Sequence, residues 1–442
     1  MRLPTTAPTL GELFARIDLN DRIPKVFEAR LSVAVDGEYP HWDELRHRTP
    51  PPGLSTEEWW MGIKLARSNL GRPLPLVGTN GAPFRYCLTD GALEVLHWID
   101  QHAGGEILVS EGITDPANRS RYLVSSLMEE AITSSQLEGA TSTRKVAKDM
   151  LRTGRAPRDR SERMIMNNFR AMSRISEVAD RPLTPDLVYE LHRILTEGTL
   201  DDPESAGRPQ QEGEIRVGVY DPDGTLVHTP PPAAELSSRL VAMCLFANGK
   251  SGIGFVHPVV RAILLHLWLA YDHPFEDGNG RTARALFYWS MLSSNYWMFE
   301  YLSISRILHS APAKYARSFL YVETDELDAT YFVLYQLSVI QRAIDDLMGY
   351  LRRSMKDVRQ TVQLLRESTL NHRQVALLTH AIGHSNAEYT TRSHSTIHRV
   401  TEQSARTDLL DLEARGFLRH MKVGKKFVFN PVVDLAQRIA AP

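Results

Sequence analysis

The pattern that most restricts the fold is a long run of helical periodicity through the middle of the chain. From about residue 115 to 355, apolar residues return at i, i+3 and i+4, which is the spacing of one face of an α-helix. Residues 328–366 continue as a helical stretch that we predict to hold more than one helix. The other predicted helices cover residues 119–138, 142–153, 161–178, 184–195, 233–248, 258–271, 279–295 and 311–323. The predicted fold class is therefore mainly α.

One segment inside this helical region has a different period. Ile215, Val217 and Val219 alternate with Arg, Gly and Tyr, which is typical of a strand with one face covered. The turn-forming residues 221–224, Asp-Pro-Asp-Gly, follow, and a second short run begins at residue 225. We therefore predict a β-hairpin at about 214–229.

Composition excludes several classes of protein. The 442 residues carry a formal net charge of -2, with 43% hydrophobic and 24% charged residues, as in ordinary globular proteins. Cys87 and Cys244 have no paired spacing, which argues against a disulfide framework or a cysteine zinc site. No segment has the ~20 consecutive apolar residues of a membrane span. We expect a soluble, cytoplasmic protein without a membrane partner.

The N-terminal 105 residues are mixed in character, with one clear helix start. Ser55 followed three residues later by Glu58 forms a capping-box pattern, which predicts a helix from there to about Ser68. Trp59 and Trp60 lie in its first turns, and we expect them to pack the domain rather than to bind a ligand.

The most informative stretch is residues 273–284, HPFEDGNGRTAR, between two predicted helices. Glycines at a helix start allow a ligand to approach the backbone, and the free N–H groups of the first turn favour an anion. Arg281 and Arg284 are three residues apart on the helix and suit phosphate oxygens. Asp277 offers a hard oxygen for Mg²⁺, and His273 a base for proton transfer near neutral pH. Together they predict a site that holds a polyphosphate and deprotonates an attacking group.

This stretch resembles the signature HPFx[D/E]GNGRxxR of the Fic (Fic/Doc) family and matches it in full. The resemblance implies a Fic helical core and, as activity, transfer of AMP from ATP to a Ser, Thr or Tyr hydroxyl of a protein. It makes His273 the general base and Asp277 the Mg²⁺ ligand, and Phe275 a core anchor of the loop. It places Arg284 on the γ-phosphate and Tyr315 near the adenine. The ATP-binding residues that it implies are Gly278, Asn279, Gly280, Arg281, Thr282, Arg284 and Tyr315.

Two further features are similar to the same family. Fic domains carry a β-hairpin flap that pairs with an extended segment of the target, so the flap would include Ile215, Val217 and Val219. Upstream, residues 134–139, SSQLEG, resemble the inhibitory motif [S/T]xxxE[G/N] of Fic proteins. The resemblance implies that Ser134, Glu138 and Gly139 end an inhibitory helix at about 119–138. Glu138 would then pair with Arg284 and deprive the γ-phosphate of its partner.

Residues 371–442 hold ten Lys and Arg against six Asp and Glu, a formal charge of +4. The pattern there predicts three helices and a hairpin, which resembles a winged helix-turn-helix. Such a domain binds DNA through a recognition helix and a basic wing, or serves protein contact and dimerisation. The predicted DNA contacts are Arg399, Gln403, Arg406, Lys425 and Lys426.

These observations combine into one hypothesis with two alternatives. We expect an N-terminal helical Fic-associated domain at 1–105, a Fic domain at 106–355 and a winged helix-turn-helix domain at 356–442. The expected activity is protein adenylylation, including of the chain itself, with ATP as substrate, Mg²⁺ as cofactor, an unknown target protein as partner, and a homodimer as assembly. The alternatives are a Fic enzyme that removes AMP, and a DNA-binding regulator for which nucleotide is a signal.

Overall fold

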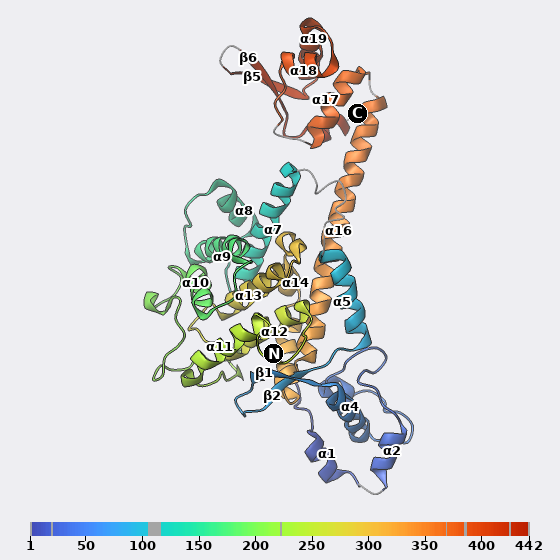
Figure 1. The fold of residues 1–442 in the computed structure, drawn as a ribbon, viewed down its shortest axis with the longest axis vertical. Coiled ribbons are helices and arrows are strands. Elements are labelled where there is room, and N and C mark those ends of the chain that lie inside the picture. The colour runs from blue at the N-terminus through green and yellow to red at the C-terminus, as the bar shows by residue number, and fades with distance from the viewer. Residues whose placement is uncertain are drawn as a thin grey trace. The chain divides into compact units, whose positions relative to one another are not determined.

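The chain divides into two compact units in the computed structural model, residues 1–105 with 126–344 and residues 106–125 with 345–442 (Figure 1). The structure describes residues 2–18, 21–104, 116–221, 223–367, 369–383, 387–423 and 426–440. The predicted domain boundary at 105/106 falls outside the described residues.

The N-terminal part of the first unit is a set of helices with one two-stranded sheet. The predicted capping box is present, since the Ser55 hydroxyl accepts from the Glu58 N–H at 3.2 Å and the Glu58 carboxylate accepts from the Ser55 N–H. Trp59 and Trp60 are buried in the apolar cluster beneath this helix, as predicted. The elements are α1 Leu10–Arg16, α2 Arg22–Glu28, α3 Trp42–Leu45, α4 Thr56–Leu70, β1 Arg72–Val77, β2 Pro83–Tyr86 and α5 Asp90–Ala103.

The helical core follows the predicted periodicity closely. Its elements are α7 Pro116–Leu137, α8 Arg144–Thr153, α9 Arg160–Val178, α10 Pro185–Thr196, α11 Leu236–Ala247, α12 Pro258–Asp272, α13 Asn279–Ser293, α14 Ile304–Ser310, α15 Pro312–Thr324 and α16 Thr330–Glu367, with short 3-10 turns at Pro203–Ser205, Ala233–Glu235 and Trp297–Tyr301. Helices α12 and α13 lie side by side and are buried along most of their length (Figure 1). The loop that joins them is therefore held between two rigid elements.

Two predictions about these elements were wrong. Residues 330–367 form one helix, α16, because the segment holds no proline, and Gly349 costs only about 1 kcal/mol in a helix interior. The hairpin is shorter than predicted, with β3 at Val219–Tyr220 and β4 at Leu226–His228, so Ile215 and Val217 lie outside the strands. Their backbone groups bond instead to the side chain of Gln210, which donates to the Ile215 carbonyl and accepts from the Val217 N–H. Pro222 of the predicted turn lies outside the described residues.

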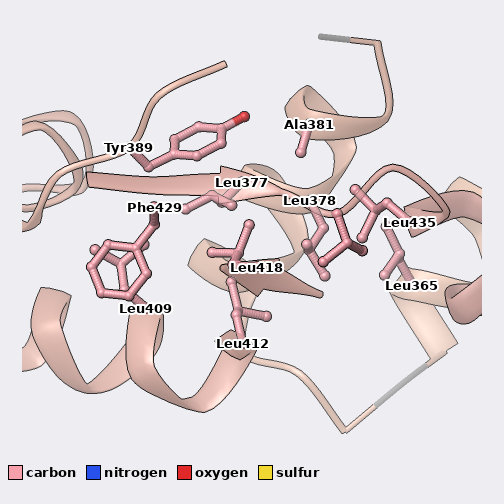
Figure 2. Close-up of a cluster of buried hydrophobic side chains, with 11 residues drawn as sticks. Leu365, Leu377, Leu378, Ala381, Tyr389, Leu409, Leu412, Leu418, Phe429 and Leu435 are labelled. Carbon is pink, nitrogen blue, oxygen red and sulfur yellow. The ribbon is translucent and has the colours of Figure 1, made fainter. Parts of the chain in front are cut away.

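The second unit has three helices followed by a hairpin, the predicted order. They are α17 His372–Gly383, α18 Thr391–His398, α19 Glu402–Ala414, β5 Leu418–Val423 and β6 Lys426–Pro431, with a short helix α20 Leu435–Ala440 that we did not predict. Tyr389 adds one antiparallel bridge to Phe429. Figure 2 shows how leucines from these helices and from β5 converge with Tyr389 and Phe429 in one apolar core. None of the described helices is long and apolar enough to span a bilayer.

A buried polar cluster connects α4 to the segment between α15 and α16 through hydrogen bonds and ion pairs. The Asp325 carboxylate accepts from Lys64 Nζ at 2.7 Å and from the Tyr331 hydroxyl at 2.7 Å, and its side chain is fully buried. Arg67 donates to the same hydroxyl at 2.7 Å and lies 3.5 Å from the centroid of the Tyr39 ring. The cluster contributes to folding because each buried charge has an oppositely charged or polar partner.

We predict that Asp325→Asn lowers the free energy of unfolding, measured by urea denaturation, by about 3 kcal/mol, because it removes the buried one of the two carboxylates that pair with Lys64. The value is at the low end for a broken buried pair because Glu326 still contacts Lys64. Glu57→Gln is the matched control, since Glu57 pairs with Arg16 at the surface, and it should cost under about 1 kcal/mol. Equal effects of the two changes would contradict this role for the cluster.

Candidate active site

The loop begins at His273, which ends α12 in a left-handed conformation with φ 44° and ψ 53°. This conformation costs about 1–2 kcal/mol for a residue with a side chain, so its surroundings must hold it in place. Arg216 does so, because its guanidinium donates to the carbonyls of Asp272 at 2.8 Å and of His273 at 3.1 Å. Its Nε also donates to the Pro231 carbonyl at 2.8 Å. The position of the His273 ring is thus fixed through its backbone.

The environment of His273 favours the neutral ring. Burial, followed by the electrostatic interaction with His228, lowers the pKa of His273 to about 4. The His228 ring is held by the Glu323 carboxylate, 2.9 Å from Nδ1, and by the Tyr271 carbonyl, 2.7 Å from Nε2. We expected a pKa near neutrality, and the difference follows from burial, which the sequence does not reveal. The ring is therefore ready to accept a proton at pH 7.

The middle of the loop is held by its own side chains. Asn279 donates to the Phe275 carbonyl at 2.8 Å and accepts from the Phe275 N–H at 2.9 Å. The Thr282 hydroxyl donates to the Gly278 carbonyl at 2.8 Å. The side chains of Asn279 and Thr282 therefore shape the loop, and Phe275 is fully buried as its core anchor.

Helix α13 starts with an N-terminus that no side chain caps. Gly278 precedes it with φ 83°, and its first turn leaves backbone N–H groups without helical acceptors. A Cβ at Gly278 would lie 2.7 Å from the Thr196 methyl group, and a Cβ at Gly280 would collide with the Glu138 carboxylate. Both positions thus require glycine in this arrangement.

Arg281 is buried and only partly satisfied. It donates to the Leu195 carbonyl at 3.0 Å and to the Asp277 carboxylate at 3.3 Å. Its Nε is buried and has no hydrogen-bond partner among the described residues. Burial lowers the pKa of Arg281, which shows how unfavourable the charge is in this place. A bound anion at the start of α13 would supply the missing partner.

Arg284, one turn further along α13, meets the end of α7. It donates to the Ser134 hydroxyl and carbonyl, both at 2.9 Å, and to the Glu138 carboxylate at 2.8 Å. Burial lowers the pKa of Arg284, but the Glu138 carboxylate raises it, and the resulting pKa lies above the ordinary value. Gly139 follows with φ 88°, the left-handed conformation that ends a helix. The structure thus brings together the residues of both sequence motifs, 150 positions apart.

Asp277 and Tyr315 contact different partners, Arg281 and Arg160 for Asp277 and His266 for Tyr315. The Asp277 side chain is 41% exposed and lies 3.5 Å from Arg160. Among the described residues no group of three or more His, Cys, Asp or Glu could hold a metal, so Mg²⁺ here would need phosphate oxygens besides Asp277. The Tyr315 hydroxyl bonds to His266 at 2.7 Å, and burial raises its pKa to about 12. Its contact with adenine stays a prediction.

The predicted flap residues flank or follow Arg216, whereas the predicted DNA-contact residues belong to the second unit. Ile215 is 91% exposed, while Val217 and Val219 are half-buried. In the second unit, Arg399 is the left-handed residue between α18 and α19, and Gln403 and Arg406 are exposed on α19. Lys425 lies outside the described residues, and Lys426 begins β6.

Sequence reasoning missed several residues that contact the loop, among them Arg216, His192 and Arg160. Arg216 was placed in a strand and His192 in an apolar helix, where each reads as an ordinary member of its element. No signal in a single sequence pairs them with partners that are 56 to 117 positions away.

Residues 182–291 match the family model described as Fic/DOC family. This part of the chain is therefore similar to the Fic/DOC family. Among curated relatives, the chain is 38% identical over 109 residues to Protein adenylyltransferase Fic of Aedes aegypti, and 29% identical over 165 residues to that of Drosophila erecta. These matches cover 25% and 36% of this chain but only 19% and 31% of the relatives.

A solved Fic family protein from Desulfovibrio desulfuricans G20 has a similar fold, with a TM-score of 0.52 and 17% identity. The match covers 82% of this chain and 98% of that one. At this identity the likeness concerns the fold alone. The mainly α architecture with a Fic core is therefore as predicted.

Proposed function

We propose that the chain is a protein adenylyltransferase, which transfers AMP from ATP to a hydroxyl of a protein, including itself. The observation that carries the proposal is the buried Arg281 with its unpartnered Nε, beside the uncapped start of α13. This arrangement suits a polyphosphate, and the neutral His273 ring lies at the opposite end of the same loop. The names of the curated relatives support the same activity.

The residues have separate roles in this reaction. His273 takes the proton from the attacking hydroxyl, whose oxygen forms a bond to the α-phosphorus. The bond between that phosphorus and the oxygen bridging to the β-phosphate breaks, and pyrophosphate leaves. The α13 N-terminus and Arg281 stabilise the charge that develops there. Asp277 would hold Mg²⁺, which supplies further charge neutralisation when bound.

Glu138 regulates the site in this proposal. Its carboxylate occupies Arg284 and lies against Gly280, where the γ-phosphate needs both the arginine and the space. Two anions cannot use the same guanidinium edge, so ATP binds unproductively while Glu138 stays in place. The alternative that the chain removes AMP uses the same His273, and it differs in needing Glu138 for activity.

We predict that His273→Ala lowers transfer by ~10²–10⁴ and leaves ATP affinity nearly unchanged, because the base acts on the hydroxyl and not on the nucleotide. Mass spectrometry of AMP addition and calorimetry with a non-hydrolysable ATP analogue give the two readouts. With His273 present, the rate should not fall from pH 8 to pH 6, since a pKa of about 4 keeps the ring neutral throughout. Wild-type transfer by His273→Ala would refute this assignment.

We predict that Glu138→Gly raises AMP transfer by roughly ten- to a hundredfold, because a charge-assisted bond to Arg284 is worth about 1.5–3 kcal/mol. The gain should disappear in Glu138→Gly with Arg284→Ala. Glu138→Gln, one residue past the end of α7, and Glu129→Gln on α7 form a matched pair, since Glu129 contacts Arg144 and Lys148 instead. Only the Glu138 change should activate. A folded, ATP-binding Glu138→Gly protein with lower activity, tested also for release of AMP from a modified target, would favour AMP removal.

We also propose that residues 371–440 bind double-stranded DNA. Within this part, four of the six acidic residues are paired internally, as Arg373–Asp408, Arg415–Asp411, His420–Glu413 and Arg438–Asp434. By contrast, Arg392, Arg399, Arg406 and Lys422 are exposed and make no ion pair among the described residues. The unpaired positive charge thus gathers on the α18–α19 pair and on β5, where a winged helix meets phosphates.

We predict that Arg399→Ala with Arg406→Ala weakens binding to a mixed-sequence duplex and lowers the slope of log affinity against log salt by about 2, one for each lost phosphate contact. Fluorescence anisotropy at salt concentrations of about 50 to 200 mM measures the affinity and its slope, because phosphate contacts weaken over this range. Arg415→Ala with Arg438→Ala removes the same charge from paired positions and should change the slope less. No binding by the intact chain, or equal effects of both doubles, would leave protein contact as the function of this domain.

A further inference from the structure

A buried histidine beneath the loop has no place in the proposed chemistry. His192 lies on α10, is 0% exposed, and stacks on the Phe275 ring with 3.7 Å between centroids and 8° between planes. A fully buried imidazole is uncommon unless both of its nitrogens are satisfied. Here both are, and one of them reaches the candidate site.

The hydrogen bonds of His192 determine which nitrogen carries the proton. The Gly207 backbone N–H lies 2.9 Å from Nδ1, so Nδ1 must accept. The Asp277 carbonyl lies 2.9 Å from Nε2, so Nε2 must donate. The ring is therefore the neutral Nε2–H tautomer, in agreement with burial, which lowers the pKa of His192 to about 4. A charged ring would lose the bond to Gly207.

The bond to Asp277 fixes a peptide that joins two functional parts. Since the peptide unit is planar, holding the Asp277 carbonyl toward α10 directs the Gly278 N–H to the opposite side, where it lies 2.5 Å from the Asp277 carboxylate. Gly278 has φ 83° and, as glycine, resists rotation of this peptide less than other residues would. A bond from outside the loop is thus needed to keep one orientation.

We propose that His192 is a positioning residue of the nucleotide site. Through the Asp277–Gly278 peptide it orients both the Asp277 carboxylate and the first N–H groups of α13 toward the polyphosphate end of a nucleoside triphosphate. It does not touch the ligand. Its Nδ1 accepts from the Gly207 N–H, and three residues later the Gln210 N–H donates to the Pro274 carbonyl of the loop at 2.8 Å. The inference rests on the proposed function for the identity of the nucleotide.

Two substitutions separate the hydrogen bonds from the packing. His192→Phe keeps a ring to stack on Phe275 and loses both bonds. His192→Gln keeps an N–H donor that can reach the Asp277 carbonyl. Both are made in the Glu138→Gly chain, and Glu138→Gly alone is the reference. Calorimetry measures affinity for a non-hydrolysable ATP analogue with Mg²⁺ and for adenosine, and mass spectrometry measures the transfer rate.

We expect His192→Phe to lower ATP-analogue affinity and transfer by about 10- to 100-fold, as for other residues that orient ligand-binding groups, while adenosine affinity stays unchanged. His192→Gln should recover part of the loss. Unchanged ATP-analogue affinity in His192→Phe would overturn the inference. So would an equal loss for adenosine together with a lower melting temperature, because that result indicates a role in folding only. If the reference chain adds no AMP, the proposed function fails, and the two affinities still test His192.

Discussion

The constraint on which this site depends is the burial of two guanidinium groups on one face of α13. A buried charge must be paired, or the fold bears a cost of several kcal/mol. Arg284 meets this requirement within the chain, through Ser134 and Glu138. Arg281 meets it only in part, since its Nε has no partner among the described residues. In the proposed function, ATP supplies the partner that Arg281 lacks and competes with Glu138 for Arg284, so binding and inhibition follow from the same two buried charges.

The shape of the loop depends on bonds from outside it. Arg216 holds the carbonyls at the end of α12, and His192 holds the Asp277 carbonyl from α10, while Asn279 closes the loop on itself. Each acts on backbone oxygens, so none of the three bonds uses the His273 ring or the Asp277 carboxylate. Because His192 acts from α10, which packs against α13, this support shares the rigidity of the core.

The sequence pointed to the residues to which the proposed function assigns chemistry, but not to those that hold them in place. HPFEDGNGRTAR placed His273, Asp277 and both arginines in one loop, and the SSQLEG motif placed Glu138 opposite Arg284 before any contact was known. Helical periodicity located α7 to α13 within a few residues because their apolar faces are buried. The strand expected at Ile215 and Val217 failed because Gln210 takes their backbone bonds, a contact without periodicity. The low pKa of His273 also escaped prediction, since burial depends on the packed fold.

Gly280 shows why inhibition and catalysis are difficult to separate in such a site. The Glu138 carboxylate lies directly over it, at a distance that any Cβ would prevent. In the proposed reaction the phosphates must approach the same backbone, so they also need a residue without a side chain. A side chain at this position would remove the inhibitor and the substrate together. The two can be separated only by a change of Glu138, which follows α7, because Glu138 competes for Arg284 and is not itself part of the loop.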